Sequence, residues 1–184
     1  MKLFLLSLLL TLFFGSSAMA QDASFVEVFG GYSHQSLDPT SRGGDRAGLN
    51  GWHTNVSMNL VGFLEVEADL SGTYGNLNGR KVNLHTFMAG PRFDLEGEKI
   101  SFFFHILYGI SKISGEGAVL TPLIGLPSDS GLAIVPLGGG FEININKKFS
   151  YRVAQFDLIV ATWGSNSGHS HPRFSTGVVF NLGN

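Results

Sequence analysis

The stretch WHTNVSMNLVGFLEVEADLSGTY, residues 52–74, decides the fold of this chain. Before Gly62, every second residue from Trp52 onward is apolar or threonine, and the residues between them are polar. After Gly62 the alternation resumes, with apolar residues from Leu64 to Leu70 separated by carboxylates. Because side chains of a strand alternate between its two faces, this pattern predicts a hairpin of two long, two-sided strands. Each strand has about ten residues, which suits a tilted strand that crosses a bilayer.

The same alternation continues on both sides of the hairpin and predicts an all-β chain of eight antiparallel up-and-down strands. Their expected ranges are 25–34, 52–60, 63–74, 84–94, 100–113, 131–144, 149–162 and 172–182. Long polar connections alternate with short turns, which leaves no room for crossover helices between parallel strands. Such a meander closes most naturally into a barrel, because closure removes the edge strands. Arg152 has the opposite parity to Gln155 and Asp157, so we expect a β-bulge near Val153-Ala154.

The composition agrees with one domain that works outside the cytoplasm. Of the 184 residues 14% are charged, against roughly 25% in soluble domains. Cysteine is absent, and the net charge of −2 provides no basic field for nucleic acid. Lys2, the apolar run at 3–14 and the small-x-small pattern at 18–20 predict a secretory signal peptide at 1–20. The mature barrel domain is then expected at 21–184, without a transmembrane helix.

Alternation alone does not decide which face of the barrel looks inward, and a secreted soluble lipocalin-like barrel would put its apolar face inside. Three observations favour a transmembrane β-barrel with the apolar face outside. The polar face has small and acidic residues but few lysines, unlike a solvated surface. The long connections share one end of the barrel and the short turns share the other. Aromatic residues form two expected girdles: Phe63, Phe93, Phe149 and Tyr151 beside the short turns, and Tyr32, Trp52, Tyr74 and Trp163 beside the long loops.

Seven segments also carry a family resemblance. They are FVEVFGGYS (25–33), GWHTNVSMN (51–59), FLEVEADLSG (63–72), HTFMAGPRF (85–93), FHILYGIS (104–111), PLGGGFEI (136–143) and RFSTGVVF (173–180). In these segments the chain resembles the small outer-membrane β-barrel proteins of Gram-negative bacteria, related in architecture to the OmpA transmembrane domain. The resemblance implies a place in the cell outer membrane, in contact with its lipid and lipopolysaccharide. It also implies folding by the barrel-assembly machinery, which reads a terminal aromatic residue in the family; Phe180 is the expected equivalent, although four residues follow it.

Charges inside so narrow a barrel must be paired, because its interior is just wide enough for side chains. Counting heights from the short turns places three acid–base pairs on neighbouring strands. The expected pairs are Glu65 with Arg92, Glu142 with Arg152, and Asp157 with Arg173. His53 and His105 share the inward parity and are expected to act as hydrogen-bonded fillers. We therefore expect a plugged lumen that conducts poorly; the alternative is that some charges face water at the mouths.

Residues that could support catalysis are few. His34-Gln35-Ser36 and His169-Ser170-His171 each bring a base close to a hydroxyl, as a lipid-modifying enzyme would require. Both segments lie in or beside expected loops, and polar loop residues are the favoured interpretation, so no enzyme is predicted. No phosphate loop, dinucleotide motif or Cys-x-x-Cys pair supports a cofactor.

A metal site at the outer rim is a separate hypothesis. The first and last strands are neighbours in a closed barrel, so His34, His169 and His171 should approach one another, and neutral imidazoles there would bind Zn²⁺ or Ni²⁺. Unpaired rim histidines are the favoured alternative. The sequence as a whole predicts a monomeric outer-membrane barrel with a structural or interaction role. A narrow, porin-like channel for small solutes, a lipid-modifying enzyme and a soluble binding protein remain alternatives.

Overall fold

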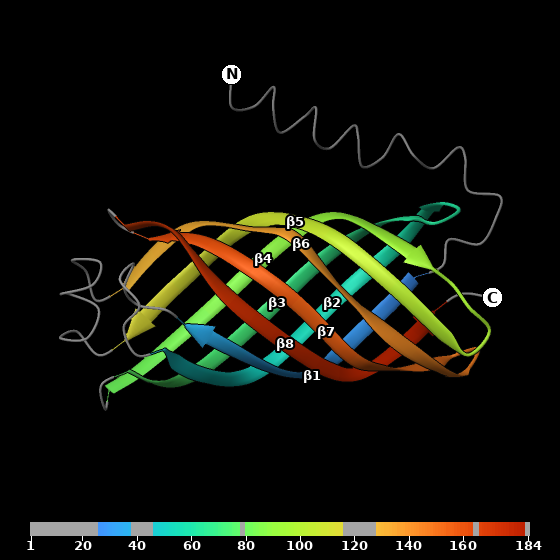
Figure 1. The fold of residues 1–184 in the computed structure, drawn as a ribbon, viewed down its shortest axis with the longest axis horizontal. Helices are drawn as coiled ribbons and strands as arrows, with labels where there is room; N and C mark the ends of the chain where they lie inside the picture. The colour runs from blue at the N-terminus through green and yellow to red at the C-terminus, as the bar shows by residue number, and fades with distance from the viewer. Residues whose placement is uncertain (1–25, 38–45, 78–79, 116–127, 164–165, 183–184) are drawn as a thin grey trace, which may run out of the picture.

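The structure confirms the closed antiparallel barrel. The computed structural model describes residues 26–37, 46–77, 80–115, 128–163 and 166–182, and the expected signal peptide at 1–20 lies outside them. These residues form eight strands: β1 (Val26–Leu37), β2 (Ala47–Val61), β3 (Leu64–Leu77), β4 (Arg80–Leu95), β5 (Ile100–Gly115), β6 (Ser128–Asn146), β7 (Phe149–Trp163) and β8 (Asn166–Leu182). Each strand pairs antiparallel with the next one in the chain, and β1 pairs with β8 to close the barrel (Figure 1). Within the described residues, no helix is long and apolar enough to cross a membrane.

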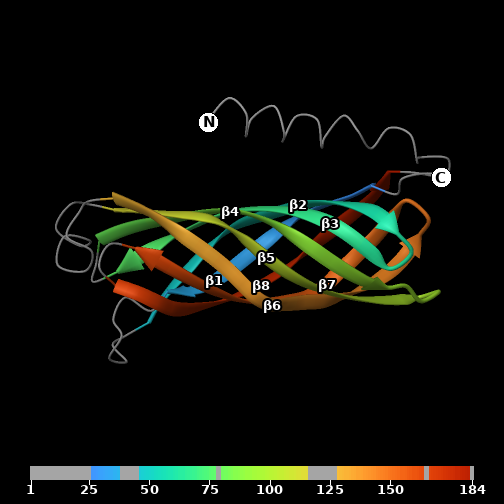
Figure 2. The same cartoon turned by 90° about the horizontal axis from the view of Figure 1, so that it is seen from above.

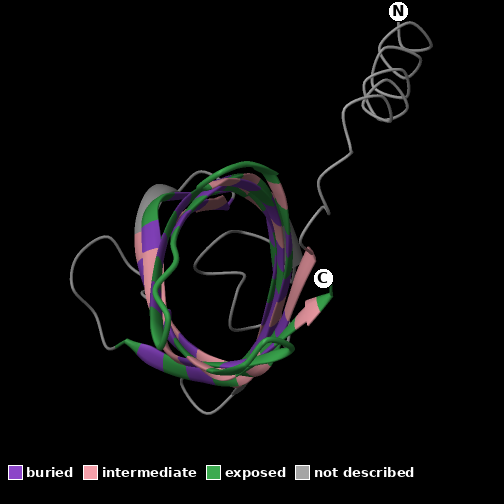
Figure 3. Ribbon diagram, turned by 90° about the vertical axis from the view of Figure 1, so that its right-hand side faces the viewer, coloured by how far each residue is buried: buried purple, intermediate pink, exposed green. Residues whose placement is uncertain are grey.

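The barrel has two unlike ends. The turn end holds the short connections 62–63, 96–99 and 147–148, and it is also where β1 begins and β8 ends. The loop end holds the other connections and lies at the opposite end of the long axis (Figure 2). At the turn end, Gly62 has a left-handed φ of 56°, which glycine adopts without a steric penalty, and its carbonyl accepts a hydrogen bond from Asn59. Figure 3 looks along the barrel from the turn end and shows the strands as one closed ring.

The strands extend further toward the loop end than the sequence predicted. The predicted loops at 75–83 and 164–171 were wrong, because only residues 78–79 and 164–165 separate the strands there. β3 and β4 stay paired up to Leu77 and Arg80. At the ends of β3 and β4 polar residues hid the strands, because Asn76 and Lys81 are exposed whereas their neighbours Leu77 and Val82 are buried in the lumen.

The alternation of polar and apolar faces reverses near the loop end. Along most of the barrel, polar side chains are buried inside and large apolar ones are exposed outside. Toward the loop end the interior contains an apolar cluster: Leu37, Ala47, Leu49, Leu77, Val82, Leu84, Met88, Leu107, Ile113, Ala133, Val135, Ile159, Ala161 and Trp163. The outer wall at this height exposes polar residues such as Asn50, Asn76, Lys81 and Lys112. The expectation of a polar lumen therefore holds for only part of its length.

The β-bulge predicted near Val153-Ala154 is confirmed. Arg152 of β7 pairs with Gly177 of β8, whereas Gln155 pairs with Ser175, so β7 has one more residue than its partner over this interval. Because of the extra residue, side chains before and after the bulge point in the same direction although their sequence parity differs. Arg152 and Gln155 are consequently both fully buried in the lumen.

Candidate functional site

The middle of the lumen is organised around Arg173 of β8. Its guanidinium forms a two-pronged contact with Asp69 of β3, with N···O distances of 3.0 and 2.8 Å. On the other side it donates to Asp157 Oδ2 from Nε at 2.9 Å and from Nη2 at 2.7 Å, and it also reaches Ser71 Oγ at 3.0 Å. All of these side chains are buried, so the charge-assisted bonds form away from water. One arginine thereby ties β8 to β7 and to β3 on a separate part of the wall.

Two buried histidines extend this middle layer. His53 Nε2 lies 2.5 Å from Asp69 Oδ2. His105 lies between two carboxylates, with Nε2 2.8 Å from Asp157 Oδ1 and Nδ1 3.2 Å from Glu67 Oε2. An imidazole donates from both nitrogens only when it is protonated, so this arrangement suits a charged His105. Both histidines are thus hydrogen-bonded parts of the lumen, in the position that the sequence predicted.

A second charged layer lies nearer the turn end, around Arg92. Its Nη2 is 2.5 Å from Asp94 Oδ2 and 3.1 Å from Glu27 Oε2, and its Nη1 donates to Ser57 Oγ at 3.2 Å. Glu65, the partner expected from the sequence, is further away, with 3.5 Å between its Oε2 and Arg92 Nε. Sequence reasoning missed Glu27 and Asp94 as partners, although both have the inward parity of their strands.

Arg152 completes the turn-end layer. Its Nε donates to Glu142 Oε1 at 2.8 Å, as expected from the sequence, and its Nη1 donates to Gln155 Oε1 at 2.7 Å. Its guanidinium carbon is also 4.2 Å from the ring centroid of Phe29 and 4.4 Å from that of Phe103. Arginine over an aromatic face is attracted to the π electrons, and the desolvated setting strengthens this attraction. The structure therefore brings together all three expected acid–base pairs, and it adds two buried aromatic rings between them.

The arginines of these layers are shielded from solvent and closely surrounded by other side chains. Arg92 and Arg152 are 0% exposed and Arg173 is 1% exposed. A Cβ added at Gly138 would collide with the ring of His105 and the carboxylate of Asp157. The apolar cluster lies beyond them toward the loop end. Charged layers and an apolar cluster thus follow one another along the lumen.

The aromatic residues expected at the two girdles occupy the outer wall, with one exception. Exposed members are Tyr32, Trp52 and Tyr74 toward the loop end, and Phe63, Phe93, Phe149 and Tyr151 toward the turn end. Trp163 is the exception: it is 6% exposed and packs inside the lumen, with its ring centroid 5.0 Å from that of His171. Beyond the bulge it shares the inward parity of Asp157 and Ile159, which corrects its assignment to the outer girdle.

The structure does not bring the rim histidines together as a metal site. His34 is exposed on the outer wall, whereas His171 is fully buried in the lumen. Across the β1–β8 ladder His34 faces Phe174, which is three positions from His171, so the two imidazoles lie on opposite faces of the wall. The side chain of His169 lies outside the described residues. The prediction rested on the adjacency of the two strands, but His34 and His171 point to opposite faces of the wall.

The first His–Ser segment has a defined environment on the outer wall. His34 Nδ1 lies 2.8 Å from Asn50 Oδ1, and Tyr32 donates to the same oxygen at 2.5 Å. Ser36 follows His34 by two positions on β1 and therefore has the same outward direction. A histidine that is oriented by a neighbouring strand and lies beside a hydroxyl resembles part of a nucleophilic site. In a catalytic triad a carboxylate orients the histidine, whereas here the amide of Asn50 does so.

Comparison with known proteins supports the fold. No family model matches the chain, and no curated protein matches it. Among solved structures, Neisserial surface protein A has a TM-score of 0.65 at 10% identity, over 88% of this chain and 100% of that chain. Ail, the attachment invasion locus protein of Yersinia pestis, in complex with the heparin analogue sucrose octasulfate, has a TM-score of 0.60 at 14% identity, over 86% and 99%. At these identities the similarity shows that the chain shares the eight-stranded barrel of such surface and outer-membrane proteins.

Proposed function

We propose that this chain is an integral protein of the outer membrane with a structural or interaction role. The observation that carries the proposal is the outer wall, where large apolar side chains remain exposed on every strand. They include Tyr32, Trp52, Val66, Phe87, Phe104, Leu137, Phe156 and Val178. A contiguous apolar surface of this extent marks contact with a membrane or a partner, because water would disfavour it. We infer that lipid covers this belt.

The interior argues against a soluble lipocalin-like protein. A soluble ligand-binding barrel keeps its apolar face inside, whereas this barrel buries three arginines and their carboxylates there. The two aromatic rows fit the interfacial girdles of a membrane barrel. Beyond the aromatic row at the loop end (Tyr32, Trp52 and Tyr74), the outer wall becomes polar, as it would where the wall leaves the lipid. We therefore place lipopolysaccharide and phospholipid around the belt, and the loop end outside the cell.

The proposal extends to biogenesis and assembly state. Phe180 is exposed on the outer wall of β8, and its ring centroid lies 5.1 Å from that of Phe149. This position suits an aromatic residue that the barrel-assembly machinery could reach before closure. The apolar belt surrounds the barrel and is not confined to one side, which supports a monomer surrounded by lipid.

A plugged lumen favours this role over a channel for small solutes. The buried arginines and the apolar cluster occupy the path that ions would take. The test combines membrane fractionation, gel mobility with and without boiling, and single-channel recording on the purified full chain. We expect an outer-membrane protein whose folded and boiled forms migrate differently and that shows no large steady conductance. A soluble fraction would refute the membrane proposal, and a large steady conductance would refute the plug.

A lipid-modifying enzyme is a second candidate, and one observation favours it. His34 contacts Asn50 through a hydrogen bond and lies two positions before the outward-pointing Ser36. Both residues are close to the aromatic row at the loop end. A hydrolase at this position would meet the acyl or headgroup region of an outer-leaflet lipid. Mass spectrometry of lipid A from cells that express the chain tests this candidate: unaltered acylation supports the structural role, and lost acyl chains support the enzyme.

A further inference from the structure

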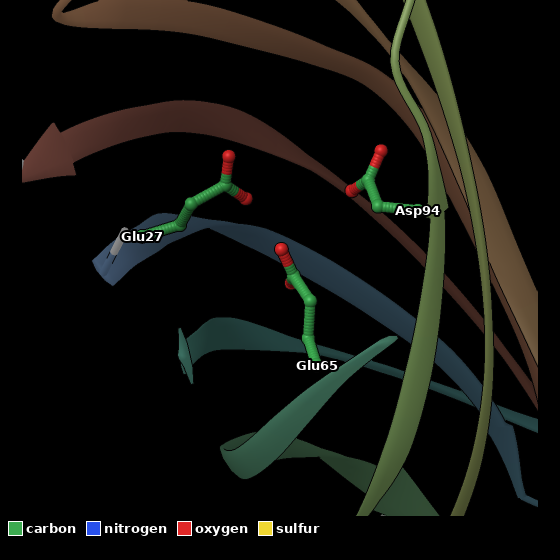
Figure 4. A group of neighbouring side chains, drawn as sticks. All are labelled: Glu27, Glu65 and Asp94. Carbon is green, nitrogen blue, oxygen red and sulfur yellow. The ribbon is translucent and has the colours of Figure 1, made fainter. Parts of the chain in front are cut away.

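Three carboxylates from three strands meet at the turn end of the lumen. Glu27 comes from β1, Glu65 from β3 and Asp94 from β4, and each offers an oxygen within 4.8 Å of the others. In Figure 4 these side chains extend toward one another from different parts of the wall. Two oxygens that each bind one Ca²⁺ at about 2.4 Å can be at most about 4.8 Å apart, so the spacing fits a shared ion. We propose that these three residues bind a divalent cation of the Ca²⁺ type.

The charge balance of the turn-end layer supports a missing cation. Its buried cations are Arg92 and Arg152, and they face four carboxylates: Glu27, Glu65, Asp94 and Glu142. The middle layer differs, because Arg173 lies between Asp69 and Asp157, and His105 lies between Asp157 and Glu67. Counted as ionised, the four carboxylates exceed the two arginines by two negative charges, and uncompensated buried charge is costly. One divalent cation would neutralise that excess.

Buried oxygens without hydrogen-bond donors give an independent indication. Asp94 is 8% exposed; its Oδ2 accepts from Arg92, whereas its Oδ1 has no hydrogen-bond partner among the described residues. Glu65 is 4% exposed, and its Oε2 has the ionic contact with Arg92 but no hydrogen bond. A buried carboxylate oxygen that accepts no hydrogen bond retains part of its desolvation penalty. A bound cation would satisfy both oxygens.

The site is open to ions from the turn end. A cavity of about 740 Å³ is lined there by Glu27 and Asp94 together with Asn181 and residues of the short turns. The side-chain oxygen of Asn181 is buried and also has no hydrogen-bond partner among the described residues. Amide oxygens are Ca²⁺ ligands, and the cavity has room for waters that would complete the usual about six to eight oxygens.

The donor set selects the type of ion. It consists of oxygens, without the imidazole or thiolate ligands that favour zinc, copper or nickel. Mg²⁺ requires a near-ideal octahedron, whereas Ca²⁺ accepts the irregular geometry that side chains from separate strands provide. A Ca²⁺ ion here would hold β1, β3 and β4 together at the mouth of the barrel. This role is additional to the proposed function and does not depend on it.

The test measures Ca²⁺ binding to the refolded full chain in detergent micelles. Isothermal titration after chelator treatment should show saturable binding of about one Ca²⁺ per barrel, and Ca²⁺ should raise the midpoint of thermal unfolding. Asp94→Asn keeps the shape of the side chain and should weaken binding by at least about tenfold, because affinity follows ligand charge. Glu98→Gln is the matched control, because Glu98 lines the cavity outside the cluster and should bind like the unmodified chain.

Gel mobility before boiling verifies that each variant is folded. If Asp94→Asn does not fold, Glu27→Gln carries the test, because Glu27 lies at the mouth and its side chain is 14% exposed. Absence of saturable Ca²⁺ binding to the folded unmodified chain would overturn the proposal. Equal affinities for the cluster variant and the Glu98→Gln control would overturn it as well, since the ion would then bind elsewhere.

Discussion

Replacing Arg173 with methionine tests whether the buried network stabilises the barrel. The change removes five hydrogen bonds, four of them to the carboxylates of Asp69 and Asp157. Methionine fills much of the space but leaves two buried carboxylates with less compensation. Breaking a buried ion pair from one side costs about 3–5 kcal/mol, so we expect a loss of that size in the free energy of unfolding. Urea titration in phospholipid vesicles, followed by tryptophan fluorescence, measures it.

A matched variant separates the charge from the packing. The triple change Arg173→Met, Asp69→Asn and Asp157→Asn removes the arginine together with the charges that it compensates. Replacing all members of a buried ion pair is often close to neutral, so the triple variant should regain most of the lost stability. A single variant that unfolds at the same urea concentration as the unmodified chain would refute the argument. That result would mean that water, and not Arg173, stabilises the two carboxylates.

Three further predictions concern the packing, the belt and the outer wall. Gly138→Ala should lower the free energy of unfolding in vesicles by about 1–3 kcal/mol, because its methyl group would overlap His105 and Asp157. Gly30→Ala, which has open space at its Cβ, should lower it little. Ile106→Arg should cost about 2–4 kcal/mol by the same measurement, because Ile106 lies within the apolar belt; Asn76→Arg, on the polar wall near the loop end, should be nearly neutral. Ser36→Ala should leave the acylation of lipid A unchanged in expressing cells; a change relative to the unmodified chain would favour the enzyme.

The period-two alternation was enough to predict the fold and the inward face of most strands. Glu65, Arg92, Glu142, Arg152, Asp157 and Arg173 are all buried in the lumen, where their parity put them. The sequence also predicted the β-bulge in β7, because Arg152 and Asp157 can both point into the lumen only if an additional residue lies between them. These features depend on parity within a strand, which the sequence contains.

Features that depend on position across strands were predicted less well. Arg92 has closer contacts with Asp94 and Glu27 than with Glu65, because the stagger of β1 and the rotamers decide which carboxylate it reaches. Trp163 was predicted to be a girdle residue from its place at a strand end, but beyond the bulge its side chain points inward with those of Asp157 and Ile159. His34 and His171 were predicted to meet because their strands are adjacent, yet a wall of backbone lies between them.

The reversal of polarity near the loop end explains both the hidden strand ends and the proposed role of that end. Where lipid surrounds the wall, apolar residues must face outward, and the interior can be charged if the charges are paired. Where water surrounds the wall, the same strands need polar residues outside and an apolar interior, as in a soluble barrel. The change occurs beyond Tyr32, Trp52 and Tyr74, so under the proposed function that aromatic row marks the boundary between lipid and water. Under the proposed function, the barrel beyond it is surrounded by water and has its own buried apolar cluster, and we propose that this part of the molecule meets a partner outside the cell.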